Sequence, residues 1–340
     1  MKDHVSIEEE TSQLRIKAPH VVLLGAGASV ATCPDGDRNG RSLPVMSNLA
    51  AMLGLRELIP ASLRRRNFEA AYSVIASKPN ETRRARAIEE RIYEYFDGLA
   101  LPEIPTIYDH LLLALRPKDV VATFNWDPLL IQAVLRNRAV LHETGCPTLL
   151  FLHGNVLEAR CETDHVIGPK GTACSACGAA LAPSRLLYPV TQKDYAKDVF
   201  LKDSWARVEH AFKHAFMVTI FGYSAPRSDR EAVTLLRRGW GAAEKREMEQ
   251  FEFIDIREEA ALVKSWKSFI HTHHYQVRKD FFSSSLMLHP RRTGEDWMSR
   301  YWEARWTTPN PPPRADSLDD LHRWYRPLLD AERTAARMAG

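Results

Sequence analysis

The chain of 340 residues has no long hydrophobic run, few cysteines and little net charge. None of its apolar stretches is long enough to cross a bilayer, which excludes a membrane-spanning helix and predicts no membrane partner. Residues 1–10 lack the apolar core of an export signal, so we expect a cytoplasmic protein. The net charge of +3 is too small to predict direct binding of nucleic acid.

Cysteine is too scarce for a disulfide framework, because the whole chain has five. Three of the five lie close together, which favours a metal site in a reducing compartment. The remaining composition, with 45% hydrophobic and 26% charged residues, is typical of a globular protein. A chain of this length can bury a large core and form one large domain or two.

A glycine turn follows the first apolar run. Residues 21–24 read Val-Val-Leu-Leu, as a buried parallel strand requires, and Gly25, Ala26, Gly27 and Ser29 come directly after. Glycine lets the backbone turn sharply and approach a ligand, and a following helix would direct its free N–H groups at a phosphate. The third glycine of the usual dinucleotide fingerprint is missing, so an ordinary tight turn is the alternative.

A second apolar run ends in Thr123, Asn125 and Asp127, with Pro128 opening the next helix. In open α/β sheets, ligands lie outside the carboxyl ends of the strands, so these polar side chains are binding candidates. The alternative for Asp127 is that it only caps the helix that follows.

A third apolar run, residues 148–152, ends in His153 and Gly154. Histidine is more often structural than catalytic when it stands alone. Here it is the first polar side chain after a buried run, and the glycine leaves room beside its ring. A side chain with a pKa near ~6.5 can take a proton at neutral pH, so His153 is a candidate base.

Two later apolar runs end in the same way. Residues 216–221 lead into Gly222 and Ser224, and residues 250–254 lead into Asp255. An acid in this place could hold a ribose hydroxyl of an adenosine.

The clustered cysteines have the spacing of a zinc knuckle. Cys174 and Cys177 form a Cys-x-x-Cys pair, Cys161 precedes them, and His165 or Asp164 would supply the fourth ligand. Structural zinc in such a knuckle contributes on the order of 10 kcal/mol to local folding. The alternative is a loop that packs without metal.

We expect an α/β fold, namely a Rossmann-like parallel sheet with added modules. The expected organisation is an N-terminal arm (1–17), a domain built on the parallel sheet (18–265), a helical insertion within it (43–116), a zinc knuckle (158–180) and a helical C-terminal extension (266–340).

The motifs stand in a fixed order along residues 20–260. They are a Gly-Ala-Gly-x-Ser turn, a Thr-x-Asn-x-Asp strand end, a His-Gly pair, a cysteine knuckle and a Gly-x-Ser strand end. In this order the set resembles the sirtuin family, and in particular its bacterial branch that destroys NAD in anti-phage defence. The resemblance implies a Rossmann-like sheet, NAD as the substrate and a structural zinc.

The chain departs from sirtuin deacylases at two points. Their glycine turn is followed by Gly-Ile-Pro-Asp-Phe-Arg, whereas residues 33–38 here read Cys-Pro-Asp-Gly-Asp-Arg. Their ribbon usually has four cysteines, and here one is replaced. Both departures weaken the case for binding an acyl-lysine peptide, and neither touches Asn125 or His153.

By resemblance, Asn125 orients the nicotinamide ribose and the attacking water, and His153 is the base or holds the ribose hydroxyls. Nicotinamide leaves as a neutral ring, so the reaction needs a group that steadies an oxocarbenium-like sugar rather than a general acid. The resemblance assigns the dinucleotide contacts to Gly25, Ala26, Gly27 and Ser29 at the diphosphate, Asp127 at the nicotinamide side, and Gly222, Ser224 and Asp255 at the adenosine side. Thr123 is a further expected contact with the dinucleotide.

The sequence therefore predicts an NAD glycohydrolase that releases nicotinamide and ADP-ribose as an anti-phage effector. Emptying a cell of NAD is lethal, so we expect control by homo-oligomer formation, a separate partner protein or a small activating ligand. Two alternatives stay open at this point. One is an NAD-dependent protein deacylase, and the other is a silent subunit that senses NAD or ADP-ribose.

Overall fold

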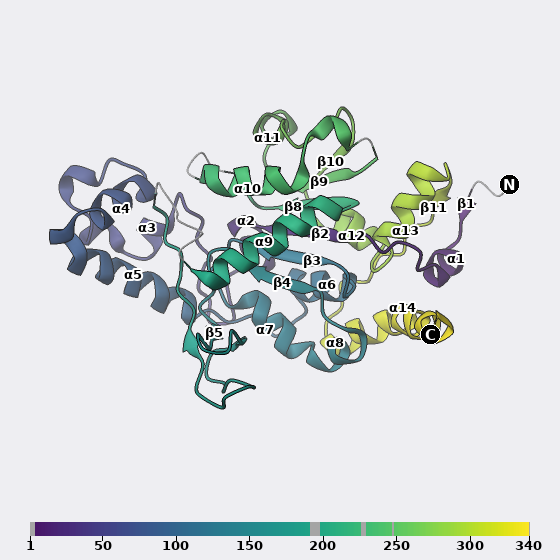
Figure 1. Cartoon of the computed structure of the whole chain (residues 1–340), viewed down its shortest axis with the longest axis horizontal. Coiled ribbons are helices and arrows are strands. Elements are labelled where there is room, and N and C mark those ends of the chain that lie inside the picture. The colour runs from purple at the N-terminus through teal and green to yellow at the C-terminus, as the bar shows by residue number, and fades with distance from the viewer. Residues whose placement is uncertain (1–3, 191–197, 226–228, 247, 340) are drawn as a thin grey trace.

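Six strands form the central sheet of the computed structural model, which describes residues 4–190, 198–225, 229–246 and 248–339 (Figure 1). The strands are β2 (His20–Leu24), β3 (Val120–Thr123), β4 (Thr148–Phe151), β8 (Met217–Phe221), β9 (Gln250–Ile254) and β10 (Tyr275–Arg278). Their order is β10-β9-β8-β2-β3-β4, and every neighbouring pair is parallel. The α/β class and the parallel sheet predicted from the apolar runs are confirmed.

The chain reverses its direction across the sheet at β2. It runs from β2 to β3 and β4 on one side and then crosses over to β8, β9 and β10 on the other. β2 therefore pairs with both β3 and β8. Such a switch point leaves a crevice at the carboxyl ends of the strands, which is where open α/β sheets bind ligands.

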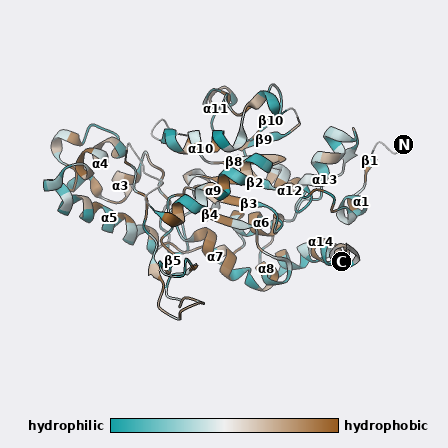
Figure 2. Ribbon diagram, in the orientation of Figure 1, coloured by the Kyte–Doolittle hydropathy of each residue, from teal (hydrophilic) through white to brown (hydrophobic). Residues whose placement is uncertain are grey.

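Helices cover both faces of the sheet. They are α6 (Ile107–Ala114) and α7 (Leu129–Arg136) on one face, and α9 (Val199–His214), α10 (Arg230–Trp240) and α11 (Glu259–Trp266) on the other. Alternate side chains of a strand point to opposite faces. Val22 and Leu24 accordingly join the first core, and Val21 and Leu23 join the second. Figure 1 shows α9 crossing in front of the strands, and Figure 2 shows hydrophobic residues gathered on the central strands and on α7.

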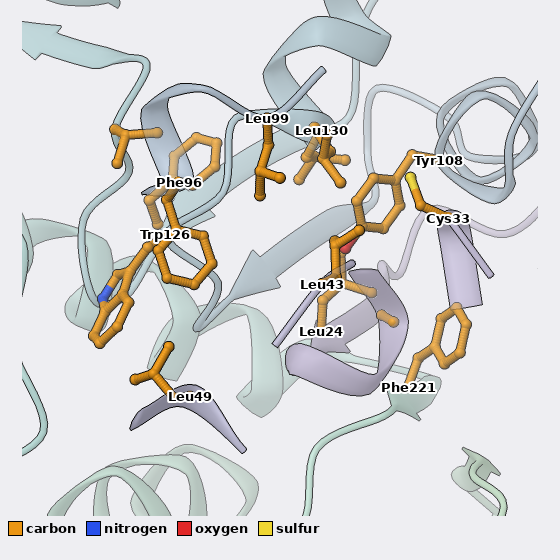
Figure 3. Packing of buried hydrophobic residues seen from close by; sticks show 14 of the residues in the cluster. Leu24, Cys33, Leu43, Leu49, Phe96, Leu99, Tyr108, Trp126, Leu130 and Phe221 are labelled. Carbon is orange, nitrogen blue, oxygen red and sulfur yellow. The ribbon is translucent and has the colours of Figure 1, made fainter. Parts of the chain in front are cut away.

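The helical insertion forms a lobe between β2 and β3, at the left of Figure 1. Its helices are α3 (Leu49–Met52), α4 (Phe68–Ala76) and α5 (Thr82–Asp97), with the 3₁₀ turns η1 (Leu55–Glu57), η2 (Ala61–Leu63) and η3 (Pro79–Glu81). Ile88, Ile92 and Phe96 form the buried face of α5 and belong to the same core as Leu24. The lobe is therefore packed onto the sheet domain through shared hydrophobic contacts (Figure 3).

A second, antiparallel sheet has three short strands in the order β6-β5-β7. They are β5 (Glu158–Arg160), β6 (Ile167–Pro169) and β7 (Ala182–Pro183). Cys161 directly follows β5, and Cys174 and Cys177 lie between β6 and β7 in sequence. Cys161 and Cys174 belong to a small hydrophobic core of their own.

The two ends of the chain pack against each other. Strand β1 (His4–Val5) pairs in parallel with β11 (Trp306–Thr307), and helix α1 (Ile7–Ser12) packs against the terminal helix α14 (Leu318–Ala339). The expected N-terminal arm is thus a folded element attached to the C-terminal extension. Figure 1 shows both ends on the same side of the molecule, away from the helical lobe.

The expected boundary at residue 265 divides the central sheet, because β10 lies beyond it and pairs with β9. The chain after β10 docks on the sheet domain through Arg291, whose guanidinium donates to Leu113 O over 3.1 Å and Leu115 O over 2.7 Å. The same guanidinium pairs with Glu332 of α14 over 2.6 Å. The extension is therefore part of the sheet domain's packing rather than a separate unit.

The remaining elements connect these parts. They are α8 (Arg138–Thr144), η5 (Ala243–Lys245), η6 (Phe281–Ser283), α12 (Ser285–Leu288), α13 (Thr293–Trp297) and a π-helical turn (Met298–Trp302). Within the described part of the chain, every helix is too short or too polar to span a membrane.

Candidate active site

Three glycines bring the ends of β2 and β8 into contact at the switch point. Gly25 N–H donates to Phe221 O over 2.9 Å, and Gly27 N–H donates to Gly222 O over 3.1 Å. A Cβ on Gly25 would lie 2.6 Å from Gly222 O, and one on Gly27 would lie 2.8 Å from Gly222 Cα. Gly222 itself has a φ of +62°, which L side chains rarely adopt. The glycines are needed first for this close packing of backbone on backbone.

Helix α2 (Ala26–Thr32) starts at the second residue of the glycine turn, as the sequence predicts. The N–H groups of Gly25 and Gly27 are already donated to carbonyls of the chain. Gly25 and Gly27 therefore cannot offer these N–H groups to a diphosphate. The contacts expected there would come from the Cα atoms of the two glycines and from Ala26.

Asn125 is held in one orientation beside this turn. Its Nδ2 donates to Gly25 O over 2.9 Å and to Ser29 Oγ over 2.8 Å, and its backbone N–H donates to Thr123 Oγ1 over 3.0 Å. A backbone carbonyl can only accept, so the atom facing Gly25 O must be the amide nitrogen. The side-chain oxygen Oδ1 accepts no hydrogen bond from the described residues, which leaves it available to a ligand.

Ser29 lies at the centre of a buried hydrogen-bond network. Its Oγ donates to Asp127 Oδ2 over 2.7 Å and lies 2.8 Å from the hydroxyl of Tyr108. A hydroxyl has one proton and two lone pairs, so Ser29 must accept from both Asn125 and Tyr108. Its capacity is then filled. The expected contact of Ser29 with a diphosphate does not fit this arrangement, and its role here is to hold Asn125.

Asp127 is 4% exposed and makes two hydrogen bonds, one at the start of α7 and one to Ser29. Its Oδ1 accepts from the Leu129 N–H at the start of α7 over 3.3 Å, while Oδ2 accepts from Ser29. Burial raises the pKa of Asp127 to about 6, although both hydrogen bonds oppose the shift. A carboxyl with this pKa changes charge close to neutral pH, which is common at functional sites.

His153 follows β4, and Asn125 follows the neighbouring strand β3. Thr123 of β3 pairs with Phe151 of β4, and each candidate residue lies two positions beyond its strand's member of that pair. The His153 ring is buried and packs edge-on against Phe124, with ring centroids 4.8 Å apart. Gly154 has a φ of +76°, and a Cβ there would lie 2.3 Å from Arg185 O, so glycine is required to place this turn.

The residues expected at the adenosine side lie across β8 and β9. Gly222 N–H donates to Ile254 O over 3.0 Å, which puts the end of β9 beside the glycine turn. Ser224 is exposed, and Asp255 is half-buried and paired with Arg257 over 2.8 Å. Arg257 has no counterpart among the sequence predictions.

Two further residues of the site were missed by the sequence analysis, Tyr108 and Phe124. Tyr108 comes from α6 and is 1% exposed, and burial raises the pKa of its phenol well above the usual range. Phe124 stacks on Tyr223 with centroids 4.2 Å apart and touches His153 on its other side. Figure 3 shows Tyr108 among the buried side chains near Leu24 and Cys33. Both residues look like core positions in the sequence, because nothing local marks their contacts with the polar residues.

The three clustered cysteines come together as the spacing predicts, and Asp164 is the fourth member of the group. Cys161, Cys174, Cys177 and Asp164 offer ligand atoms that all lie within 4.8 Å of one another. Asp164 Oδ2 is 3.3 Å from the sulfurs of Cys161 and Cys174. His165 is not part of this group. Its backbone φ is +55°, and its ring lies against Phe200 with centroids 5.6 Å apart.

Three thiolates and one carboxylate fit a tetrahedral zinc ion. Of the two fourth ligands that the sequence left open, Asp164 lies with the cysteines and His165 does not.

Comparison with known proteins gives matches among solved structures alone. No family model matches the chain, and no curated protein matches it. Among solved structures, a Sir2 homologue in complex with NAD matches 86% of this chain and 97% of its own, with 15% identity and a TM-score of 0.41. The likeness is to sirtuins. A structure described as a basis for the mechanism and regulation of Sir2 enzymes matches with 15% identity and a TM-score of 0.40, covering 84% of this chain and 96% of its own.

A third sirtuin structure, described in terms of substrate affinity, has 16% identity and a TM-score of 0.37, and covers 82% of this chain and 93% of its own. The case for function therefore depends on the geometry of Asn125, Ser29, Asp127 and His153.

Proposed function

We propose that this chain is an NAD glycohydrolase, which cleaves the nicotinamide–ribose bond and transfers ADP-ribose to water. One observation carries the proposal. Asn125 is anchored through Nδ2 to Gly25 O and Ser29 Oγ, and its Oδ1 is left without a partner among the described residues. This oxygen lies at the switch point of the sheet, where a dinucleotide would bind. A neutral carbonyl dipole there can orient a ribose hydroxyl or a water and steady a cationic sugar.

The reaction balances without a general acid. The bond between the ribose C1′ and the nicotinamide nitrogen breaks, and its electron pair neutralises the positively charged ring. Water attacks C1′ and loses one proton, which His153 or the solvent accepts. The products are nicotinamide, ADP-ribose and one proton.

Asp127 supports recognition of the leaving group. Among the described residues, one donor reaches its Oδ1, the N–H of Leu129 over a long 3.3 Å. When ionised, this carboxylate keeps capacity for an N–H donor such as the carboxamide of nicotinamide. The network through Ser29 would then connect the group that binds nicotinamide with the group that orients the ribose.

The three Cys residues and Asp164 would hold a structural zinc ion. When bound, zinc would link the chain after β5 to the chain between β6 and β7, and would stabilise this small sheet. The residues of the candidate active site are separate from this group in the fold, so the zinc would have no part in bond cleavage.

In the cell, we propose that the activity serves anti-phage defence by depleting NAD. Such an enzyme must be restrained until infection, so self-association, a partner protein or an activating ligand would control it. Expression in bacteria with and without phage, with measurement of cellular NAD, tests this part. A fall in NAD that needs both infection and Asn125 is expected, and unchanged NAD in infected cells would contradict it.

One assay separates the glycohydrolase from the two alternatives. The protein is incubated with NAD, with and without an acetyl-lysine peptide, and nicotinamide release is followed. Release without peptide is expected. Release that needs the peptide would indicate a deacylase, and binding of NAD without release would indicate a silent sensing subunit.

A further inference from the structure

Strand β10 forms an open edge of the central sheet, since in the described part of the chain it pairs with β9 alone (Figure 1). Phe251 N–H of β9 donates to His274 O over 3.0 Å. Successive residues of a strand direct their backbone groups to opposite sides, so those of Tyr275 and Val277 point away from β9. Among the described residues, these outward N–H and C=O groups have no hydrogen-bond partner.

A groove of about 430 Å³ lies along this edge. Its lining comes from His273, the four residues of β10 and Glu259 of α11. All four residues of β10 are half-buried, whereas β4 at the other end of the sheet finishes in the buried Leu150 and Phe151. An accessible edge with unpaired backbone groups is a template on which another strand can pair.

We propose that β10 pairs with β10 of a second copy of this chain, antiparallel and about a two-fold axis at Gln276. In this register Tyr275 stands opposite Val277 of the partner subunit, and Val277 opposite the partner's Tyr275. Each of these pairs joins outward N–H and C=O groups and can exchange two hydrogen bonds. The register uses only residues inside the strand, Tyr275–Arg278.

The side chains on one face of this edge are complementary to themselves. Tyr275 and Val277 both pack against the second core, and an aromatic residue opposite a β-branched one is a favourable cross-strand pair. The Tyr275 hydroxyl donates to Glu259 Oε1 over 2.8 Å, and Glu259 is exposed.

A cation completes the match on that face. Lys279, which is 53% exposed, lies two residues beyond Val277, and residues two apart along a strand share a face. The partner's Lys279 would therefore lie diagonal to Tyr275, on the side that carries Glu259. The two-fold axis forms this contact of acid and cation twice. Such self-complementarity is what an interface between two identical chains requires, so it identifies the second copy as the occupant.

The other face adds aromatic surface. Gln276 Nε2 lies 3.5 Å from the hydroxyl of Tyr301, and Tyr301 and its neighbour Trp302 are 37% and 60% exposed. Exposed apolar groups gathered in this way mark interaction sites. Here the partner's Arg278 would stand opposite His274, and an unprotonated imidazole can accept a hydrogen bond from a guanidinium. The inference rests on this sheet edge and not on NAD cleavage.

Sedimentation equilibrium of the full chain at several concentrations measures the association. Val277→Pro removes an outward N–H and obstructs the added strand, while the bonds between β10 and β9 are kept. Glu259→Lys and Lys279→Glu each place like charges across the contact, and the double variant restores opposite charges. Glu90→Lys is the matched control, because Glu90 is exposed on α5 in the helical lobe. Thermal melting checks that each variant is folded.

The wild type is expected to form a dimer, and Val277→Pro should raise its dissociation constant at least about tenfold. Each single charge reversal should weaken the dimer, the double variant should recover most of the association, and Glu90→Lys should match the wild type. A wild type that is monomeric at every concentration overturns the inference, and so does an assembly that Val277→Pro leaves unchanged. Failure of the double variant to recover association overturns the antiparallel arrangement. Nicotinamide release tests the proposed function separately from all of these results.

Discussion

Asn125 and His153 occupy equivalent positions on neighbouring parallel strands, each two residues beyond the paired Thr123 and Phe151. The backbone register of β3 and β4 therefore brings an amide and an imidazole to the same edge of the sheet. Phe124 directly precedes Asn125 in sequence and packs against the imidazole ring. The relationship depends on strand pairing rather than on loop conformation, so it is fixed by the core of the protein.

Replacement of Tyr108 by Phe tests whether its hydroxyl positions the site. The change removes the donor to Ser29 and leaves the ring in place. We expect a loss of about 1 kcal/mol in the free energy of unfolding and a fall in kcat with little change in KM. Tyr325→Phe is the matched control, because the buried Tyr325 hydroxyl has no hydrogen-bond partner in the described part of the chain. Equal effects of the two substitutions on kcat would show that Tyr108 has no positioning role.

The raised pKa of Asp127 predicts a pH dependence of stability with a definite sign. The folded state holds this proton up to about pH 6, whereas the unfolded chain releases it near ~3.9. The folded state therefore binds more protons between these values, and stability falls as pH rises through that window. Denaturant unfolding from pH 4 to 7 should show a shallower decline for Asp127→Asn, while the exposed-site control Asp203→Asn should match the wild type.

The same ionisation predicts a pH profile of activity. If the carboxylate of Asp127 accepts the nicotinamide carboxamide, kcat/KM for NAD should fall as pH is lowered through about 6. In Asp127→Asn this limb of the profile should disappear, together with much of the activity. Retention of the same acidic limb in the variant would assign it to another group.

Asp164 and His165 are adjacent in sequence, so substituting each of them in turn tests which one binds zinc. Asp164→Ala should lower the zinc content and destabilise the small sheet, whereas His165→Ala should keep near-stoichiometric zinc, because only Asp164 lies against the sulfurs. Metal analysis of the purified variants checks this. Zinc loss on His165→Ala with retention on Asp164→Ala would reverse the assignment.

The N-terminal helix is attached to the C-terminal extension through a buried histidine. His289 Nδ1 lies 2.8 Å from Glu10 Oε1, and Nε2 lies 3.4 Å from Asp296 Oδ1. Burial opposes protonation of His289, but the hydrogen bond to Glu10 and the charge of Asp296 outweigh it and raise the pKa above its ordinary value. A raised histidine pKa stabilises the fold below about 6.5, and this contribution is lost as pH rises through the folded-state pKa.

We therefore expect His289→Gln to loosen α1 most at acidic and neutral pH. Hydrogen exchange of residues 7–12 measures this directly, with the partly exposed His271→Gln as control. If hydrogen exchange of α1 is equally slow in His289→Gln and in the wild type from pH 6 to 8, His289 does not attach this helix.

The sheet and the edge that carries the site could be predicted from sequence, because both depend on local patterns. Apolar runs ending in Gly25, Asn125 and His153 mark buried strands and their polar ends, and parallel pairing then brings those ends together. Tyr108 could not be found in this way. Its helix reads as apolar core, and only tertiary packing brings its hydroxyl to Ser29.

The fourth member of the cysteine cluster shows a different limit. Spacing alone allows either Asp164 or His165, since adjacent residues are equally close to the cysteines in sequence. The choice is made by the backbone, because the left-handed conformation of His165 directs its ring to Phe200. The role of residues 4–17 was also beyond sequence reasoning, because pairing of β1 with β11 joins segments about 300 residues apart.

Nicotinamide release from NAD by the wild type and by Asn125→Ala, with Asn80→Ala as an exposed control, tests the central claim most directly. The account predicts release by the wild type without any peptide, a fall of at least about a hundredfold in Asn125→Ala while that variant still unfolds cooperatively, and wild-type release in Asn80→Ala. Full activity in Asn125→Ala would contradict the account, because its amide oxygen would then have no part in the cleavage.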